Sequence, residues 1–216
     1  MVIKLNISPQ VILTGSIKYE NNYRLDELNC INRIKNGDTQ AFRELVEHFR
    51  DRVFNTSLGL LQNCEDAEDV SQEVFLEIYQ SLRQFRGASK LSTWIYRIVL
   101  RKSLEHIRSA KRKKRAGLMA DLFGKENHLP VTNSSPFYHP GVKLENKERA
   151  AVLFEAISRL PDNQRMAFTM HKLESLNYSE IAEIMKISLS SVESLMFRAK
   201  HNLQKLLAVY YEKNKD

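Results

Sequence analysis

"NYSEIAEIMKISLSSVESLMFRAKHNLQKLL", residues 177–207, decides the fold of the C-terminal part of the chain. It predicts a helix, a tight turn and a second helix. Asn177 and Glu180 have the spacing of a capping box, in which each side chain accepts a backbone N–H at the other position. Met185 to Ile187 are expected to form the turn, and Ser188 is a good cap for the second helix. The inner faces are supplied at helical spacing by Ile181, Ala182, Ile184 and Met185, then by Val192, Met196, Ala199 and Leu203.

This length and pattern are typical of a helix-turn-helix, whose second helix can enter the major groove of DNA. An ordinary helical hairpin has the same periodicity. The pattern alone therefore leaves both interpretations open.

Helical periodicity also governs the chain from residue 38 onward. One helix is predicted from the N-cap Asp38 to about Leu61. The next follows Asn63, with Glu65 and Asp66 in its first turn, where the helix macrodipole favours negative charge. Its buried stripe is predicted to be Ala67, Val70, Val74, Ile78 and Leu82.

The pattern breaks at Gly87, and a third helix is predicted from Ser92 or Thr93. Its inward side chains are expected to be Leu91, Ile95, Ile98 and Val99. Arg97, Arg101 and Arg108 recur on another face.

Charge is distributed unevenly along this chain of net charge +7. The helix after Asn63 carries six acids and no base, whereas residues 97–115 carry nine Lys or Arg and one acid. From Pro161 to the end there are eight bases and seven acids. A polyanion-binding surface is therefore expected on the third helix, although a merely solvated basic helix has the same composition.

Composition bounds the class of protein. The 216 residues suffice for one large or two small domains, and scarce glycine and proline favour helix. Cys30 and Cys64 form no CxxC, which argues against a disulfide framework or a zinc site and indicates reduced thiols in the cytoplasm. Residues 1–24 lack the pattern of a signal peptide, and no run reaches the roughly 20 apolar residues of a membrane span.

The expected fold class is all-α, with two small helical domains joined by a flexible linker. Three of the five prolines fall between Gly117 and Gly141, where no period is sustained. The predicted divisions are an N-terminal extension of unknown role (1–24), a helical bundle (25–113), the linker (114–144) and the helix-turn-helix domain (145–212).

Three stretches carry a family resemblance. "DAEDVSQEVFLEIYQSLRQF" (66–85), "STWIYRIVLRKSLEHIR" (92–108) and residues 160–203, which include the opening stretch, resemble in that order the conserved blocks of bacterial RNA polymerase sigma factors. The extracytoplasmic-function group is the most similar. The resemblance covers about residues 26–115 and 148–208.

The resemblance implies that the acidic helix docks on a coiled coil of the polymerase's largest subunit. The residues placed at this contact are Asp66, Glu68, Asp69, Gln72, Glu73 and Phe75. A negative face would hold the enzyme while disfavouring DNA there.

The next block of the family binds and opens the promoter −10 element. The residues it implies here are Lys90, Ser92, Tyr96, Arg97, Arg101, Lys102 and Arg108. Phe85 and Trp94 are expected in the core rather than as platforms for bases. Arg101 stands where the family usually has Asn, and Leu100 where a polar or basic residue is frequent.

The helix from Ser188 would read the −35 element. Its candidate residues are Ser188, Ser190, Ser191, Glu193, Ser194, Phe197, Arg198, Lys200 and His201. Glu193 replaces the usual Lys and Leu195 the usual Arg, which predicts an altered −35 sequence and weak affinity of the isolated domain. Glu193 could accept from a cytosine amino group, or pair with Lys186 or Arg198.

The resemblance therefore implies a non-catalytic sigma factor whose partners are core RNA polymerase, promoter DNA and an anti-sigma factor. The alternative is a stand-alone helix-turn-helix regulator that binds its operator without polymerase. An enzyme is disfavoured, because the adjacent acids 65, 66, 68 and 69 point in different directions on a helix and no nucleophile-base pair stands out. No catalytic residue, metal ligand, cofactor or small-molecule substrate is predicted.

Overall fold

The computed structural model describes residues 26–122 and 147–213, and over these ranges it contains eight α-helices, one 3₁₀ turn and no strand. The all-α fold class is confirmed. The N-terminal extension and most of the predicted linker lie outside the described residues.

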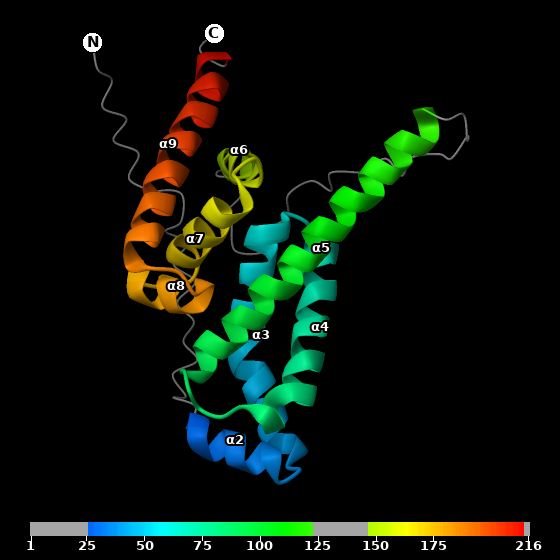
Figure 1. Cartoon of the computed structure of the whole chain (residues 1–216), viewed down its shortest axis with the longest axis vertical. Helices are drawn as coiled ribbons and strands as arrows, with labels where there is room; N and C mark the ends of the chain where they lie inside the picture. Colours follow the sequence, from blue (N-terminus) through cyan, green and yellow to red (C-terminus); the bar gives the residue numbers. More distant parts are fainter. Residues whose placement is uncertain (1–25, 123–146, 214–216) are drawn as a thin grey trace.

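The N-terminal helices form a bundle in which α3 (Thr39–Leu61), α4 (Cys64–Ser81) and α5 (Leu91–Leu122) run side by side, while α2 (Glu27–Lys35) closes one end (Figure 1). The predicted caps are present. Asp38 accepts from the amides of Gln40 and Ala41, and Asn63 accepts from the amide of Asp66. The predicted stripe of α4 is buried against Leu45, Phe49 and Val53 of α3 and the inner face of α5.

The connection from α4 to α5 is fixed by α2. A 3₁₀ turn, Leu82–Gln84, ends at the buried Phe85, and Gly87 adopts a φ of 72° that suits glycine. Lys35 of α2 donates from Nζ to the Phe85 carbonyl at 2.9 Å, and the Leu91 amide donates to the Glu27 carboxylate at 3.3 Å. The carboxylate lies at the positive end of α5, which favours its start there.

Helix α5 begins at Leu91, one or two residues before the predicted start at Ser92 or Thr93, and continues to Leu122. It therefore extends into the stretch predicted as linker. The residues from 109 to 116 are mostly Lys, Arg and Ala, which are good helix formers, and one glycine at 117 costs only about 1 kcal/mol in a helix.

The C-terminal unit consists of α6 (Lys147–Ser158), α7 (Asp162–Lys172), α8 (Tyr178–Met185) and α9 (Leu189–Lys213). The Asn177–Glu180 capping box is complete, and Lys186 makes the turn with a left-handed φ of 55°. The Ser191 amide donates to Ser188 Oγ at 3.2 Å, as expected of a cap. Of the predicted inner face, Ala182 and Met185 are partly exposed and the rest are buried.

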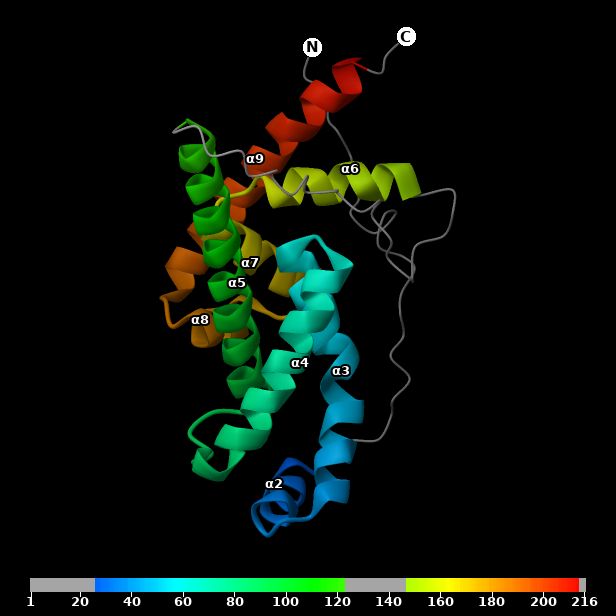
Figure 2. The same cartoon turned by 90° about the vertical axis from the view of Figure 1, so that its right-hand side faces the viewer.

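The two helical units pack against each other (Figure 2). One apolar cluster is shared between them. It joins Leu60, Tyr96 and Leu100 of the bundle to Met166, Met170, Ile181 and Ile184 of the C-terminal unit. Sequence analysis did not predict this closed arrangement.

Helices α3 and α7 are in close contact at Gly59. A methyl group on Gly59 would lie 2.6 Å from Thr169 Cγ2 and 2.6 Å from Leu173 Cδ1. The Thr169 hydroxyl also lies 3.5 Å from the Gly59 carbonyl oxygen. The absence of a side chain at residue 59 therefore permits this helix contact.

Both cysteines are in the thiol form; Cys30 is buried and Cys64 partly exposed. Within the described ranges, none of the helices combines the length and the apolar character that crossing a membrane requires.

Candidate functional site

The outer face of α4 is the acidic surface. Glu65, Glu68, Asp69 and Gln72 are exposed on it. Two exposed apolar side chains extend the same face, Leu76 at 58% and Tyr79 at 54% exposure. Sequence analysis missed both, although Leu76 lies one helical turn after Gln72 and off the buried stripe. The face thus combines negative charge with an apolar end, which suits a protein partner.

The remaining acids of α4 are engaged with bases on α5. Asp66 lies 3.1 Å from Nε2 of His106, and Glu73 lies 3.2 Å from Nζ of Lys102. Glu77 pairs with both Arg101 and Lys102. The α4–α5 contact therefore ties the acidic and basic helices together through their charges.

The predicted polymerase-contact residues consequently fall into two groups. Glu68, Asp69 and Gln72 are exposed, and no ion pair of these acids is found in the described part of the chain. Asp66 and Glu73 pair with α5, and Phe75 is partly buried against the bundle core. Trp94 and Phe85, both expected in the core, pack there with ring centroids 5.2 Å apart.

The predicted −10 residues near the start of α5 face the C-terminal unit. Tyr96 is only 3% exposed, and its hydroxyl donates to the Glu174 carboxylate at 2.7 Å. Arg97 donates to the Glu183 carbonyl at 2.8 Å and lies 3.7 Å from the Glu183 carboxylate. Lys90 lies 3.5 Å from the Glu180 carboxylate.

Glu174 occupies an unusual place for a carboxylate. It lies between the units, where burial raises its pKa, while the hydrogen bond from Tyr96 and the charge of Arg52 oppose that rise. The contact joins the loop before α8 to both α3 and α5.

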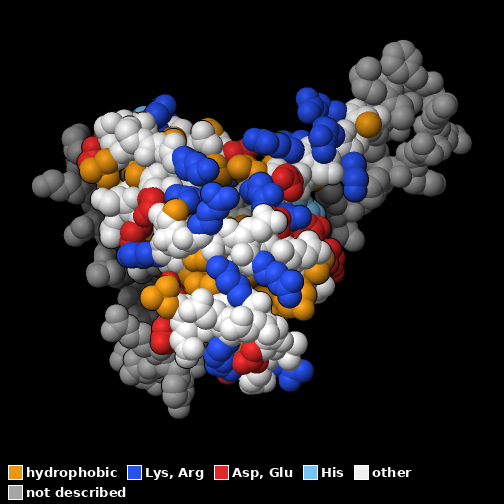
Figure 3. Space-filling model, turned by 60° about the horizontal axis from the view of Figure 1, so that its bottom comes forward, with side chains coloured by type: hydrophobic (Ala, Val, Ile, Leu, Met, Phe, Trp, Pro, Cys, Tyr) orange, Lys and Arg blue, Asp and Glu red, His pale blue; other side chains and the backbone are white. Residues whose placement is uncertain are grey.

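Farther along α5 the basic side chains are exposed. Arg108 has no ion pair among the described residues, and Lys111 lies 3.3 Å from Asp162 at the start of α7. The basic run that follows is exposed at Arg112, Lys113, Lys114 and Arg115. Figure 3 shows Lys and Arg side chains gathered over this face of the molecule.

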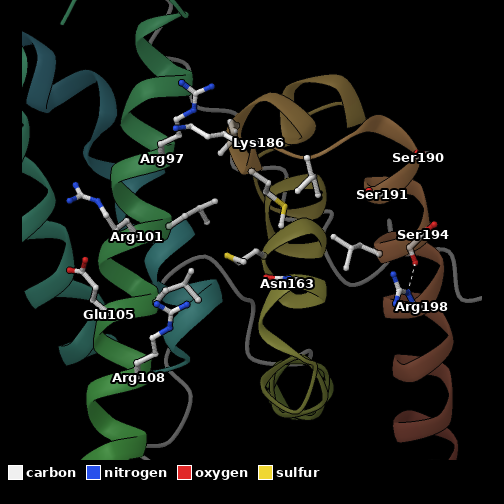
Figure 4. Close-up of a pocket in the computed structure, with 17 residues that line it drawn as sticks. Arg97, Arg101, Glu105, Arg108, Asn163, Lys186, Ser190, Ser191, Ser194 and Arg198 are labelled. Atoms are coloured by element: carbon white, nitrogen blue, oxygen red, sulfur yellow. Dashed lines mark hydrogen bonds between the residues drawn. The ribbon is translucent and has the colours of Figure 1, made fainter.

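A groove of about 810 Å³ separates α5 from α9. Arg97, Arg101 and Arg108 line it on the α5 side, and Lys186 and Arg198 line it on the other. Figure 4 shows that the Arg101 side chain points away from α9, in keeping with its ion pair with Glu77. Apolar side chains of both units, Leu100, Leu104, Met166, Ile184 and Leu195, line it. The candidate −10 and −35 residues thus meet across one cleft.

The predicted −35 residues lie along the exposed side of α9. Phe197 is 73% exposed, and Glu193 and Ser194 are also exposed. Leu189, another exposed apolar residue, precedes Glu193 by four residues and was not selected from the sequence. Ser188 serves as the cap, with Oγ 2.8 Å from that of Ser191. The other candidates, Ser190, Arg198, Lys200 and His201, are exposed.

Neither ion pair considered for Glu193 occurs among the described residues. Arg198 instead donates from Nε to the Ser194 carbonyl at 3.1 Å. Glu193 therefore presents its negative charge on the exposed side of the second helix of the helix-turn-helix.

The described ranges contain no group of three or more His, Cys, Asp or Glu side chains arranged to hold a metal ion.

Comparison with known proteins identifies two matched regions. The family described as "Sigma-70 region 2" matches residues 45–113, and "Sigma-70, region 4" matches residues 143–203. The "ECF RNA polymerase sigma-E factor" of Haemophilus influenzae is 30% identical over 185 residues, which cover 84% of this chain and 95% of that protein.

Two solved structures share the fold. CnrH, solved in complex with the cytosolic domain of CnrY, aligns with a TM-score of 0.59 and 19% identity over 83% of this chain and 96% of that one. The sigma factor RpoE of Bartonella quintana, solved with the anti-sigma factor NepR, aligns with a TM-score of 0.56 and 19% identity over 78% and 97%.

Proposed function

The chain belongs to the extracytoplasmic-function (ECF) sigma factors of the sigma-70 family, and we infer from this membership what its two charged faces do. It is a sigma factor that binds core RNA polymerase and directs promoter-specific initiation. The assignment of individual residues and domain limits to these tasks is our proposal. The proposed domains are the N-terminal extension (1–24), the helical bundle (25–113, extended along α5), the linker that follows it, and the helix-turn-helix domain (145–212).

We propose that the outer face of α4 docks on core polymerase. The strongest candidates are Glu68, Asp69 and Gln72, because they are exposed and no ion pair of the two acids is found among the described residues. Leu76 and Tyr79 would add an apolar anchor beside the charges. Asp66, Glu73 and Phe75 would support this face, since each is also engaged within the bundle.

The basic residues of α5 would bind the −10 element, and α9 would enter the major groove at the −35 element. Phosphates would be held by Arg101, Lys102 and Arg108, and Tyr96 and Arg97 would become available once the C-terminal unit moves away. On α9, Phe197 would contact a thymine methyl and Glu193 a cytosine amino group.

The remaining assignments follow from the family. The protein would act in the cytoplasm, where core polymerase is, and polymerase rather than this chain would supply the chemistry. An anti-sigma factor is a proposed partner, because RpoE of Bartonella quintana was solved with one.

The single observation that carries the polymerase assignment is the exposed acidic pair on α4, Glu68 and Asp69, which no base among the described residues neutralises. The double variant Glu68→Lys/Asp69→Lys should reduce binding to core polymerase at least about tenfold, because like charges placed across an interface cost several kcal/mol. Binding to purified core and transcription from a library of genomic fragments would measure the effect. The control is Glu47→Lys/Asp51→Lys on the exposed side of α3, which has the same charge change.

Unchanged transcription by the α4 double variant would contradict the assignment. The stand-alone regulator is tested in the same preparation. If the purified chain bound specific duplex sites without polymerase and failed to support transcription with it, that alternative would replace the sigma-factor mechanism.

A further inference from the structure

The loop between the 3₁₀ turn and α5, residues 86–90, is fixed to α2 at both of its ends. At the first end, Lys35 donates from Nζ to the Phe85 carbonyl at 2.9 Å. At the second end, the Leu91 amide donates to the Glu27 carboxylate at 3.3 Å. Phe85 and Leu91 are themselves buried, so the loop spans two residues that are held in place.

The two side chains that hold the loop lie on one face of α2. Glu27 and Lys35 are both partly buried, and at helical spacing they share a face with the buried Ile31. Leu28, off this face, is exposed. Figure 1 shows α2 at the end of the bundle where the connection from α4 to α5 lies. The helix therefore reaches the loop with the same face that it buries in the bundle.

Glu27 supplies a helix cap that the loop itself lacks. Lys90 occupies the cap position of α5, because its carbonyl accepts from the Trp94 amide at 3.1 Å, but a lysine side chain has no acceptor for the first amides of the helix. The Glu27 carboxylate accepts the amide of Leu91 instead, at the positive end of the helix macrodipole. Without this contact the first turn of α5 is expected to fray.

The loop is open to a ligand although its ends are fixed. Arg86, Gly87, Ala88 and Lys90 are exposed. Apart from its chain neighbours, no atom lies within 4 Å of the place where a Cβ on Gly87 would be. The small residues leave backbone N–H and C=O groups accessible to the edge of an unpaired base, and the two cations can contact the strand that carries it.

We propose that α2 is a specificity element for the −10 sequence, in which Glu27 and Lys35 hold loop 86–90 in the conformation that binds unpaired bases. This inference rests on the proposed function and deepens it. Both are positioning residues, since they act through the loop and not by touching DNA.

An ordered loop affects correct and incorrect sequences differently. If the loop were mobile, affinity for the correct sequence would fall by the fraction of time that the loop spends in other conformations. Affinity for other sequences depends mainly on phosphate contacts, which do not require one loop conformation. The two contacts from α2 therefore set the ratio of specific to nonspecific binding.

The test uses holoenzyme assembled from the full chain and core polymerase. Single-stranded oligonucleotides with a randomised segment are selected on the wild-type holoenzyme, after those that core alone binds are removed. The probes are the enriched sequence and a scrambled version of it. In Glu27→Ala/Lys35→Met, which leaves net charge unchanged, affinity for the enriched sequence should fall about three- to tenfold. Affinity for the scrambled sequence should change by less than about twofold.

The matched control is Arg33→Met/Glu44→Ala. It is also neutral in charge, and it removes a 2.9 Å ion pair between α2 and α3 that does not involve the loop. The ratio of the two affinities should stay at the wild-type value in this control, even if its melting temperature falls. Should either double variant not fold, Lys35→Met is compared with Arg33→Met. Lys35→Arg retains a donor for the Phe85 carbonyl and should keep most of the wild-type ratio.

Gly87→Ala tests the loop without changing α2. The φ of 72° at Gly87 disfavours any residue with a Cβ, whereas the open space around it excludes a clash. The affinity ratio should therefore fall in this variant too. Combined with Glu27→Ala/Lys35→Met, its effect should be smaller than the product of the separate effects, because both act on one loop conformation. A full product would contradict a shared conformation.

An unchanged affinity ratio in Glu27→Ala/Lys35→Met would overturn the proposal. An equal loss in this variant and in its control would also overturn it, since that result reports only the stability of the bundle. Failure of the proposed function gives a different result, because the wild-type holoenzyme would then neither initiate transcription nor enrich any sequence. If it does both and the variants keep its ratio, only the role of α2 is wrong.

Discussion

Glu174 is a titratable residue in the contact between the two units. Its carboxylate accepts a hydrogen bond from the Tyr96 hydroxyl, and the titratable groups that face it are Tyr96 and Arg52. In an open chain the same side chain would be hydrated. Because burial raises its pKa, the closed form holds the Glu174 proton to a higher pH than the open form does.

A pH dependence of closure follows. Protonation of Glu174 stabilises the closed form, and this stabilisation is complete below the ordinary glutamate pKa of 4.5. It is lost as the pH rises through the raised pKa that Glu174 has in the closed form. The wild-type radius of gyration should therefore increase with pH over that window. Glu174→Gln is uncharged at every pH and can still accept from Tyr96, so its radius should stay small and much less dependent on pH. A wild-type profile as flat as that of the variant would refute this role.

Single residues also show the limit of reading charge from sequence. The six acids of α4 form one group by composition, yet Asp66, Glu73 and Glu77 pair with α5 while Glu65, Glu68 and Asp69 do not in the described residues. Helical spacing assigns a residue to a face. It does not identify which neighbouring helix supplies a base opposite that face.

At the scale of elements, local signals predicted well. Asp38, Asn63 and the Asn177–Glu180 pair cap the helices they were expected to cap, because a capping bond involves residues only two or three apart. The end of α5 was less predictable. A basic run and a single glycine resemble the start of a linker, although both are compatible with helix.

The turn of the helix-turn-helix carries a residue in a costly conformation. Lys186 has a left-handed φ of 55°, which costs a non-glycine residue roughly 1–2 kcal/mol. Lys186→Gly should therefore stabilise the C-terminal unit by about 0.5–1 kcal/mol after the entropy cost of glycine is subtracted. Thermal unfolding followed by circular dichroism measures this, and Lys186→Ala, which retains a Cβ, should give no comparable gain. Equal melting temperatures for the Gly and Ala variants would contradict the strain.

The recognition helix offers a prediction about affinity. Glu193→Lys replaces an exposed acid by a base on the side of α9 proposed to face DNA. Affinity for duplexes of any sequence should rise, and the slope of log K against log salt should steepen by about 0.9 for each phosphate gained. Glu155→Lys on α6 is the charge-matched control. Identical salt slopes for the two variants would place Glu193 away from DNA.

At the scale of the whole molecule, the closed arrangement could not be predicted from periodicity. One signal was present: residues 56–60 at the end of α3 carry no charged side chain on any side of the helix. In the structure all five are buried, and a helix segment buried on every side needs a second neighbour. The sequence did not identify that neighbour as α7. Tyr96 illustrates the same difficulty, because a proposed DNA ligand lies in a shared apolar cluster in the absence of DNA.

The opposite charges at the contact between the two units affect how strongly the free protein binds DNA without regard to sequence. A chain of net charge +7 with a fully accessible basic helix would bind chromosomal DNA nonspecifically. Acids of the C-terminal unit pair with Lys90, Arg97 and Lys111, which lowers the positive potential of that helix toward DNA. A methyl group on residue 59 would lie 2.6 Å from side-chain atoms of Thr169 and Leu173, so these side chains or the helices that carry them would have to shift.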